Sequence, residues 1–331
     1  MTTTFALGER VLLLDPKKRR YLIELADGGE FHSHAGYVAH ADVVGRTEGS
    51  IVRSTKGSEY IALRPTLEDF VVEMPRGAQV IYPKDLGPIC LLADIGPGVR
   101  VFESGIGSGA LSMTMLRYGA DIVGYEIRED FANRARKNVQ SFLGSGALDR
   151  YRIEIADSYE GIDPAHGPFD RVVLDLPEPW QVVPHAEQVL NAGGLLVAYT
   201  PSITQAAQVR EALKGKWIDA RTIEVLHRGW HIDGQAVRPD HRMVAHTGFL
   251  SVARFLGLGD RRADHRRVDD PPDSSRKEFP MPEVTGEHQG AQPPLQGRLQ
   301  VCSAADFQVL EPFLRSGRRQ HGGQVDEDAT E

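Results

Sequence analysis

Short apolar runs alternate with helix-like segments through the middle of the chain, and this alternation limits the possible folds more than any other feature. The strand-like runs are VRVFES (99–104), DIVGYEI (121–127), YRIEIAD (151–157), RVVLDL (171–176), GGLLVAYT (193–200) and AHTGFLSVARFL (245–256). Helical patterns occupy residues 110–119, 128–144, 184–193 and 203–215. Strands and helices that alternate in this way predict an α/β domain with a mostly parallel, doubly wound sheet covered on both faces.

The regions on either side of this domain have different compositions. Residues 1–70 contain short β-like runs separated by turn signals, among them RVLLLD, YLIEL and YIALRP, and predict a small β-rich N-terminal domain. The α/β domain then takes residues 71–256. Residues 257–331 are charged, contain prolines and have few apolar residues, so we expect a largely disordered tail that is dispensable for catalysis.

Composition and charge exclude several classes of protein. The sequence has no apolar run long enough to cross a membrane and no signal-peptide pattern at its start, which together predict a cytosolic location. Its two cysteines are far apart, which argues against a zinc site or a disulfide framework. The net charge of −8 means that an RNA partner would need local basic patches. The candidates are Lys17, Lys18, Arg19, Arg20, Arg228, Arg238 and Arg242.

A glycine-rich turn connects the first strand of the α/β domain to its first helix. In VRVFESGIGSGALSMT, the residues Gly105, Gly107 and Gly109 allow a tight turn and a close approach of the backbone to a ligand at a helix N-terminus. GIGSGA also satisfies the dinucleotide-binding fingerprint, so the loop alone does not distinguish between nucleotide cofactors.

Acidic residues stand at the ends of four successive strands. Glu103 precedes the glycine loop, and Glu126, Asp157 and Asp175 end the next three strands. In a doubly wound sheet these ends share one edge, where ligands bind. Four carboxylates would repel a pyrophosphate, but they suit a ligand with an ammonium, a sulfonium and a ribose. The sequence therefore predicts S-adenosyl-L-methionine as the cofactor.

Six motifs, taken together and in order, resemble those of a known enzyme family. They are QVIYPKD (79–85), ESGIGSGAL (103–111), YEIRED (125–130), LDLPEPW (174–180), VAYTPSITQ (197–205) and HRMVAHTGFL (241–250). In this order they resemble the tRNA (adenine-58-N1)-methyltransferases, most closely the single-subunit actinobacterial and archaeal type. The resemblance covers roughly residues 5–256 and leaves out the tail.

The resemblance implies a Rossmann-like class I methyltransferase domain with a seven-stranded sheet and a homotetramer assembled as a dimer of dimers. It implies methylation of N1 of adenine 58 in the T-loop of tRNA. One departure is Ile106, where the family usually has a small residue or threonine. The cofactor-binding residues that it implies are Gln79, Tyr82, Glu103, Gly105, Gly107, Ser108, Gly109, Ala110, Leu111, Glu126, Arg128, Asp157, Ser158 and Asp175.

Asp175 is the candidate catalytic residue, because attack by adenine N1 on a sulfonium methyl spreads positive charge over the ring and its exocyclic amine. A carboxylate bonded to that amine stabilises the transition state more than the ground state. Tyr82 and Tyr199 are candidates for flanking the base. The leaving group is neutral, so the reaction requires no metal.

Three other functions compete with this interpretation. A methyltransferase for a small molecule or a protein would use the same glycine loop. A nicotinamide-dependent oxidoreductase is allowed by GIGSGA but opposed by Glu103 and the other acids. A non-catalytic tRNA-binding subunit is opposed by the intact glycine loop and Asp175.

Overall fold

The structure is a computed structural model that describes residues 4–77, 79–243 and 245–257. The expectations for the tail, including its disorder, therefore concern residues that lie almost entirely outside the described ones. None of the helices in the described residues is long and apolar enough to cross a membrane.

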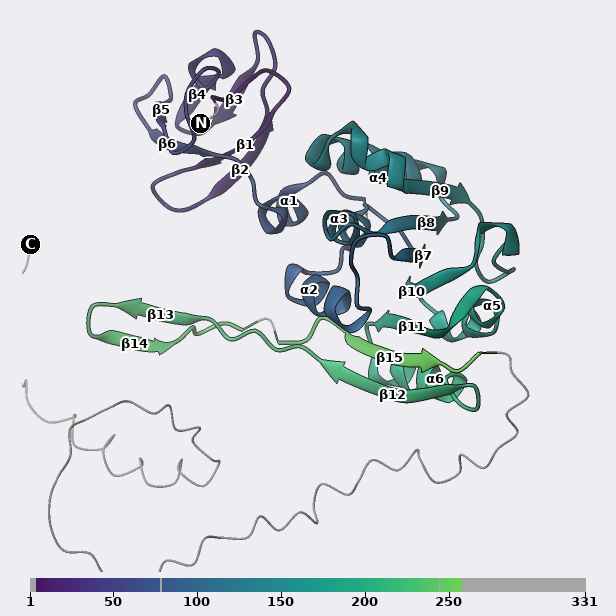
Figure 1. The fold of residues 1–331 in the computed structure, drawn as a ribbon. Coiled ribbons are helices and arrows are strands. Elements are labelled where there is room, and N and C mark those ends of the chain that lie inside the picture. The colour runs from purple at the N-terminus through teal and green to yellow at the C-terminus, as the bar shows by residue number, and fades with distance from the viewer. Residues whose placement is uncertain (1–3, 78, 244, 258–331) are drawn as a thin grey trace, which may run out of the picture. The chain divides into compact units, whose positions relative to one another are not determined.

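The N-terminal region forms two small antiparallel β-structures (Figure 1). Strands β1 (Arg10–Leu14), β2 (Arg20–Glu24), β5 (Ile51–Arg53) and β6 (Glu59–Leu63) form a sheet in the order β2-β1-β6-β5. Strands β3 (Glu30–Ser33) and β4 (Gly36–Ala39) form a hairpin that the short helix η1 (His40–Asp42) follows. Alternating apolar residues of these strands enclose their own core, which includes Phe5, Val11, Leu13, Leu25, Val38 and Tyr60.

Two helices lead into the α/β domain. Helix α1 (Leu67–Glu73) begins with a capping box, in which the side chains of Thr66 and Asp69 each accept a hydrogen bond from the other residue's backbone N–H. Helix α2 (Pro83–Leu92) has Tyr82 as its N-cap and Pro83 in its first turn, where the missing N–H of proline costs nothing. The YPKD motif therefore forms the start of α2, the helix that precedes the first strand of the large sheet.

The large sheet has seven strands in the order β12-β15-β11-β10-β7-β8-β9. They are β7 (Arg100–Ser104), β8 (Asp121–Glu126), β9 (Tyr151–Ile155), β10 (Phe169–Asp175), β11 (Leu190–Thr200), β12 (Trp217–Glu224) and β15 (Phe249–Phe255). Neighbours from β9 to β11 are parallel, and β15 is antiparallel to both β11 and β12. The expected Rossmann-like class I fold with seven strands is confirmed.

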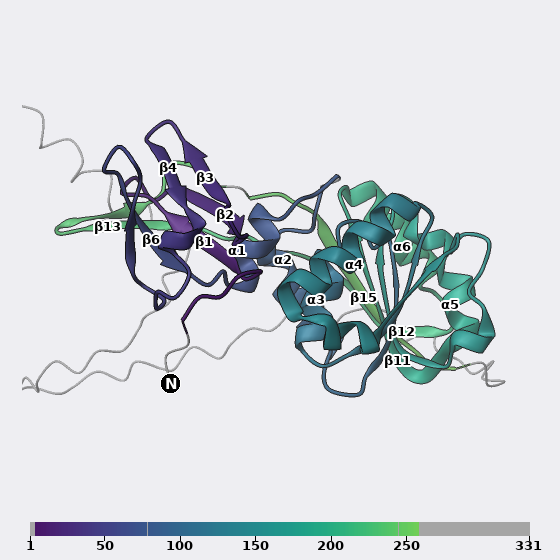
Figure 2. The ribbon, with the colours of Figure 1, turned by 90° about the horizontal axis from the view of Figure 1, so that it is seen from above.

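Helices cover the two faces of this sheet because successive residues of a strand point to opposite sides (Figures 1 and 2). One face packs on α2, α3 (Ala110–Arg117) and α4 (Glu129–Leu143), through strand residues that include Val101, Ile122, Ile153, Val173 and Val197. The opposite face packs on α5 (Val183–Val189) and α6 (Ile203–Ala212), through strand residues that include Phe102, Val172, Leu174, Leu196 and Ala198.

Short 3-10 helices complete the connections, and some elements differ from the sequence-based expectation. The 3-10 helices are η2 (Ser145–Arg150), η3 (Pro164–His166) and η4 (Pro179–Gln181). The helix expected over 184–193 ends at Val189, because Leu190 already pairs with Phe169 in the parallel ladder. Strand β12 and the hairpin of β13 (Trp230–Asp233) and β14 (Ala236–Pro239) were not predicted from the sequence.

Candidate active site

The candidate site lies at the point where the strand order of the sheet reverses. From β7 the chain continues outward through β8 and β9, and then returns to β10 on the other side of β7. The crevice beyond the carboxyl ends at such a switch point is where open α/β sheets bind ligands. Here the loop after β7 and the end of β10 come together: a Cβ atom on Gly105 would lie 1.9 Å from the backbone oxygen of Asp175.

Two neighbouring cavities open at this point. The glycine-loop cavity is lined by Gln79, Val80, Ile81, Gly105, Ile106, Gly107, Ser108, Ala110, Leu111 and Asp175. The base cavity, of about 340 Å³, is lined by Gln79, Val80, Ile81, Asp175, Leu176, Pro177, Tyr199, Pro201, Gln205 and Thr247. Asp175 and the segment 79–81 line both cavities, so they form the boundary between them.

The glycine loop has the conformation that its sequence indicates. Gly105, Gly107 and Gly109 have φ of +86°, +56° and +84°, in the left-handed region that glycine adopts readily. Gly109 is the N-cap of α3, so Ala110 and Leu111 are the first residues of that helix. Ile106 lines the cavity and is held against Gly124 of β8, where a Cβ atom would come within 2.6 Å of its Cδ1.

Glu103 lies beneath the loop and is only 1% exposed. Its Oε2 accepts a hydrogen bond from Ser112 Oγ at 2.7 Å, and Ser112 Oγ in turn accepts one from Tyr151 at 2.8 Å. Its Oε1 is buried and has no partner among the described residues, and the same holds for Ser108 Oγ. Two orphaned polar atoms at one loop indicate that a polar ligand completes the hydrogen bonding there.

The remaining predicted cofactor residues surround this loop at the ends of β8 and β9. Glu126 accepts hydrogen bonds from the backbone N–H of Gly107 at 3.1 Å and of Arg128 at 3.0 Å. Asp157 is exposed and caps a turn by accepting from the backbone N–H of Tyr159. Ser158 is buried, and its hydroxyl lies 2.8 Å from that of Ser104, which ties β9 to β7.

Two of the predicted cofactor residues, Arg128 and Tyr82, are not held at the site by the contacts of their side chains. The guanidinium of Arg128 forms an ion pair with Asp130 and lies 3.7 Å from the centre of the Phe131 ring. Tyr82 is 39% exposed and is the N-cap residue of α2, but its side chain makes no capping hydrogen bond and lines neither cavity. Their roles at the cofactor, like those of the other site residues, stay predictions.

Asp175 and Tyr199 are Cα partners at the ends of β10 and β11, so both face the base cavity. Burial raises the pKa of Asp175 to about 7. The Tyr199 hydroxyl donates to the backbone oxygen of Thr247 at 2.6 Å, and burial raises its pKa to about 12, so it stays neutral. Gln205, whose Nε2 donates to the backbone oxygen of Pro177, was not singled out from the sequence, although it ends one of the six motifs.

Two carboxyl groups with raised pKa values, Glu103 and Asp175, make the stability of the ligand-free protein depend on pH. Burial raises the pKa of Glu103 to about 8, and the nearby charges of Asp175 and Glu126 add to this, although the bond from Ser112 opposes it. A pKa raised in the folded state means that the folded protein binds more protons, so this part of the stability is complete below about pH 4 and is lost as the pH rises to about 8.

We expect Glu103→Gln to flatten the fall in the free energy of unfolding between pH 5 and pH 8 in urea titrations. Equal slopes for the variant and the wild type would contradict this.

A buried ion pair in the YPKD motif supports the wall of the base cavity. Asp85 is 0% exposed; its Oδ1 lies 2.9 Å from Lys84 Nζ, and its Oδ2 accepts from Thr247 Oγ1 at 2.5 Å. Lys84 also donates to the backbone oxygen of Val225 at 2.6 Å. The pair therefore joins the start of α2 to the segment whose Thr247 oxygen holds Tyr199.

Asp85→Ala is expected to lower the free energy of unfolding by about 3–5 kcal/mol, because it leaves the Lys84 ammonium buried without its carboxylate. Urea unfolding checks this. The control is Glu211→Ala on α6, which removes an ion pair with Lys214 whose two side chains are both largely exposed. The control is expected to change the stability by less than about 1 kcal/mol. Equal costs for the two substitutions would show that the buried pair does not stabilise the fold.

The described residues contain no group of three or more His, Cys, Asp or Glu side chains that could hold a metal ion. The site thus combines a glycine loop, buried carboxylates with an unfilled hydrogen-bonding position, and a cavity closed by an aspartate and a tyrosine. These residues fit the predicted S-adenosylmethionine, because the carboxylates suit its ammonium and ribose and the left-handed glycines leave room for a close backbone approach.

Comparison with known proteins agrees with this geometry. Residues 59–238 match the family described as "tRNA methyltransferase complex GCD14 subunit", and residues 4–52 match "TrmI-like N-terminal". The chain is 36% identical over 248 residues to tRNA (adenine(58)-N(1))-methyltransferase TrmI of Thermus thermophilus, which covers 74% of this chain and 96% of that protein.

Two solved structures have the same fold over most of their length. A SAM-dependent O-methyltransferase from Thermotoga maritima superposes with a TM-score of 0.73 at 30% identity, covering 79% of this chain and 97% of that one. The tRNA (m1A58) methyltransferase TrmI from Aquifex aeolicus gives 0.67 at 27% identity, covering 77% and 99%. With more than half of its length matched by the first family and its start by the second, the chain belongs to the TrmI/GCD14 family of tRNA methyltransferases.

Proposed function

We propose that the chain methylates N1 of adenine 58 in the T-loop of tRNA, with S-adenosyl-L-methionine as the methyl donor. The observation that carries the proposal is the position of Asp175, a partly buried acid on the boundary between the glycine-loop cavity and the base cavity. When bound, S-adenosylmethionine supplies an electrophilic methyl group on a sulfonium. Membership of the tRNA methyltransferase family and the relative named for adenine 58 support the substrate and the position.

The acids of the site and the glycine loop have separate tasks in this reaction. Glu103, Ser108 and the backbone of the glycine loop would hold the amino-acid part of the cofactor, and Glu126 would hold its ribose. Asp175 accepts a hydrogen bond from the exocyclic amine of the target adenine and turns N1 toward the cofactor. Because the ring becomes positive as N1 is methylated, this hydrogen bond strengthens along the reaction and lowers the barrier.

The tyrosines and the segment before β15 position the base. Tyr199 stays protonated and is held by the Thr247 oxygen, so its ring forms a fixed wall of the base cavity. The glycine at position 248 leaves room for the Tyr199 ring, because a Cβ atom on Gly248 would lie 2.4 Å from that ring. Tyr82, at the start of α2, is not one of the residues that line the cavity and would flank the base from its edge. A base fixed in this way reacts faster because its orientation is already correct.

Product analysis tests the proposal directly. The purified protein is incubated with unmodified tRNA and S-adenosylmethionine, the RNA is digested to nucleosides, and the product is identified by mass spectrometry and chromatography. We expect 1-methyladenosine, located at position 58 when the RNA is mapped. If the protein binds the cofactor but forms no methylated nucleoside, the substrate is instead a small molecule or a protein.

The expected homotetramer and cytosolic location stay predictions. One feature supports an assembly: Trp230 and Ile232 of β13 and Val237 of β14 lie on one face of a two-stranded hairpin and are 57%, 72% and 59% exposed. An isolated hairpin of two strands is only marginally stable in water. An apolar face of this kind is therefore expected to be covered when subunits associate.

A further inference from the structure

Three hairpin tips of the N-terminal β-structures meet in space. They are residues 15–19 between β1 and β2, residues 33–36 between β3 and β4, and residues 54–58 between β5 and β6. Arg19 Nη2 lies 3.3 Å from His34 Nε2, which joins the first tip to the second. Ser54 Oγ donates to the backbone oxygen of Ala35 at 2.5 Å, which joins the second tip to the third. We call these three segments the basic tip surface.

The basic tip surface is positively charged although the whole chain is negative. Its segments read DPKKR, SHAG and STKGS, so they carry three lysines and one arginine against a single acid, Asp15. The chain as a whole has a net charge of −8. The surface is therefore a local positive region that a polyanion would prefer over the rest of the protein.

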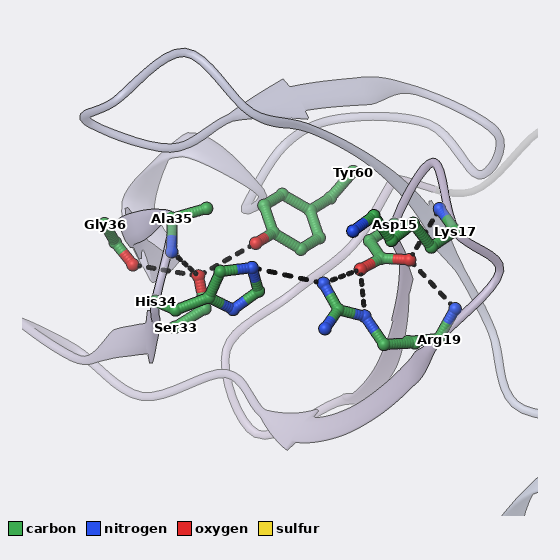
Figure 3. Close-up of polar contacts among 8 residues, drawn as sticks. All are labelled: Asp15, Lys17, Arg19, Ser33, His34, Ala35, Gly36 and Tyr60. Atoms are coloured by element: carbon green, nitrogen blue, oxygen red, sulfur yellow. Dashed lines mark hydrogen bonds and ion pairs between the residues drawn. The ribbon is translucent and has the colours of Figure 1, made fainter. Parts of the chain in front are cut away.

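The single acid shapes the first tip and does not neutralise its lysines. Asp15 Oδ1 accepts from the backbone N–H groups of Lys17 and Arg19, each at 2.9 Å, and Oδ2 accepts from Arg19 Nε at 2.7 Å (Figure 3). The same Nη2 atom that pairs with Asp15 Oδ2 at 2.6 Å lies 3.3 Å from His34 Nε2, as Figure 3 shows. The result is a braced turn from which the charged ends of two lysines are free to reach a partner.

The lysines of this surface form no ion pair with any described residue. Lys17, Lys18 and Lys56 are exposed, and no carboxylate of the described residues lies within ion-pair distance of their ammonium groups. Two arginines nearby differ in this respect, since Arg20 pairs with Asp69 and Arg53 pairs with Glu59.

Lys18 occupies a position that the other two tips give to glycine. Its φ is +61°, whereas Gly36 and Gly57 adopt +89° and +84° at the corresponding turns. A lysine is strained in this region of φ and glycine is not. Strain that the surrounding contacts hold in place is found at functional sites more than elsewhere. Here it keeps an ammonium at the end of the tip.

We propose that the basic tip surface binds the sugar–phosphate backbone of the tRNA substrate through Lys17, Lys18 and Lys56. The proposal rests on the proposed function, which supplies a folded RNA as the partner. Lysine ammonium groups bind phosphates as point charges, and such contacts position an RNA without reading its sequence. The hydroxyl groups of Thr55 and Ser58 lie in the same surface and are suited to phosphate oxygens.

A charge-removing variant tests the surface by its salt dependence. The triple substitution Lys17→Gln, Lys18→Gln and Lys56→Gln is made in the full chain, and binding of unmodified tRNA is measured from about 50 to 200 mM salt. We expect the slope of log K against log salt to become shallower by roughly 2–3, since each lost phosphate contact contributes about 0.7–0.9. We also expect a higher KM for tRNA with an unchanged kcat. The control is Arg53→Gln, which removes a paired cation from the same region and is expected to keep the wild-type slope.

A single variant separates binding from stability. Lys18→Gly relieves the strain and removes the charge, so it is expected to keep or raise the melting temperature while it weakens tRNA binding. A triple variant with the wild-type slope and affinity would contradict the proposal that this surface binds tRNA. A wild-type protein that does not bind tRNA would contradict it as well. A wild-type protein that binds tRNA with the expected salt dependence but forms no 1-methyladenosine would contradict the proposed function. The proposal that this surface binds tRNA would still hold.

Discussion

Asp175→Ala is expected to lower kcat for 1-methyladenosine formation about 100- to 1000-fold, equivalent to about 2.7–4 kcal/mol of lost transition-state stabilisation. Asp175 lines both cavities at the end of β10, and its carboxylate is the one group of the described lining residues that carries a negative charge. Because its pKa is about 7, the assay belongs at pH 8, where the carboxylate of the wild type is ionised. Single-turnover rates measure the chemical step directly.

Two further variants sharpen this test. Asp175→Asn keeps the shape and one acceptor oxygen but removes the charge, so its rate is expected to lie between those of alanine and the wild type. Glu178→Ala is the matched control, because Glu178 is an exposed acid of the same loop and binds Gln181. If Asp175→Ala methylates at the wild-type rate at pH 8, or if Glu178→Ala is equally impaired, Asp175 does not have the proposed role.

Gly105→Ala is expected to destabilise the protein by about 2–5 kcal/mol and to abolish detectable methylation. A Cβ atom at this position would lie 1.9 Å from the Asp175 backbone oxygen, and the φ of +86° is itself unfavourable for alanine. The left-handed backbone costs about 1–2 kcal/mol, and overpacking adds about 1–3 kcal/mol. Relief of the overlap would move the end of β10 away from the glycine loop and displace Asp175. Urea unfolding and calorimetric binding of S-adenosylmethionine measure both effects.

Gly107→Ala separates the two contributions. Gly107 has φ of +56° and nothing within 4 Å of the position of a Cβ atom, so only the backbone term of about 1–2 kcal/mol applies. We expect this variant to be folded under conditions where Gly105→Ala has lost stability and binding. Indistinguishable unfolding curves for the two variants would mean that the contact between Gly105 and Asp175 does not matter.

The parts of the fold that could be predicted are those whose signal is local. The buried parallel strands appear as apolar runs, and the covering helices show their own periodicity, so β7 to β11 and α3, α4 and α6 were found within a few residues. The edge strand β12 was missed because WIDARTIE has no apolar run, and its alternation of apolar and polar residues is interrupted where the register shifts between Ile218 and Arg221. The hairpin of β13 and β14 was missed because its strands, WHID and AVRP, have four residues each and are too short to show a clear strand pattern.

For the candidate site, too, the features with a local signal could be predicted from the sequence, and the contacts between distant residues could not. The acids at strand ends and the glycine loop were recognisable because topology brings the carboxyl ends of parallel strands to one edge. The Asp85–Thr247 hydrogen bond, which joins residues 162 positions apart, has no local signal, and neither has the Gln205 contact to Pro177. Arg128 was expected near the ribose, but a sequence does not show that Asp130 and Phe131 compete for its guanidinium.

Sequence by itself therefore determined the class of fold, the glycine loop and the acids that face it, since these depend on residue type and on periodicity along the chain. Only the tertiary structure decided which of these groups are buried, which are paired and which remain unsatisfied. It left Glu103 Oε1 without a partner, joined Asp85 to the wall beside Tyr199, and gathered three lysines from separate hairpins into one surface. Burial and charge pairing depend on contacts between residues distant in sequence, which no local pattern contains.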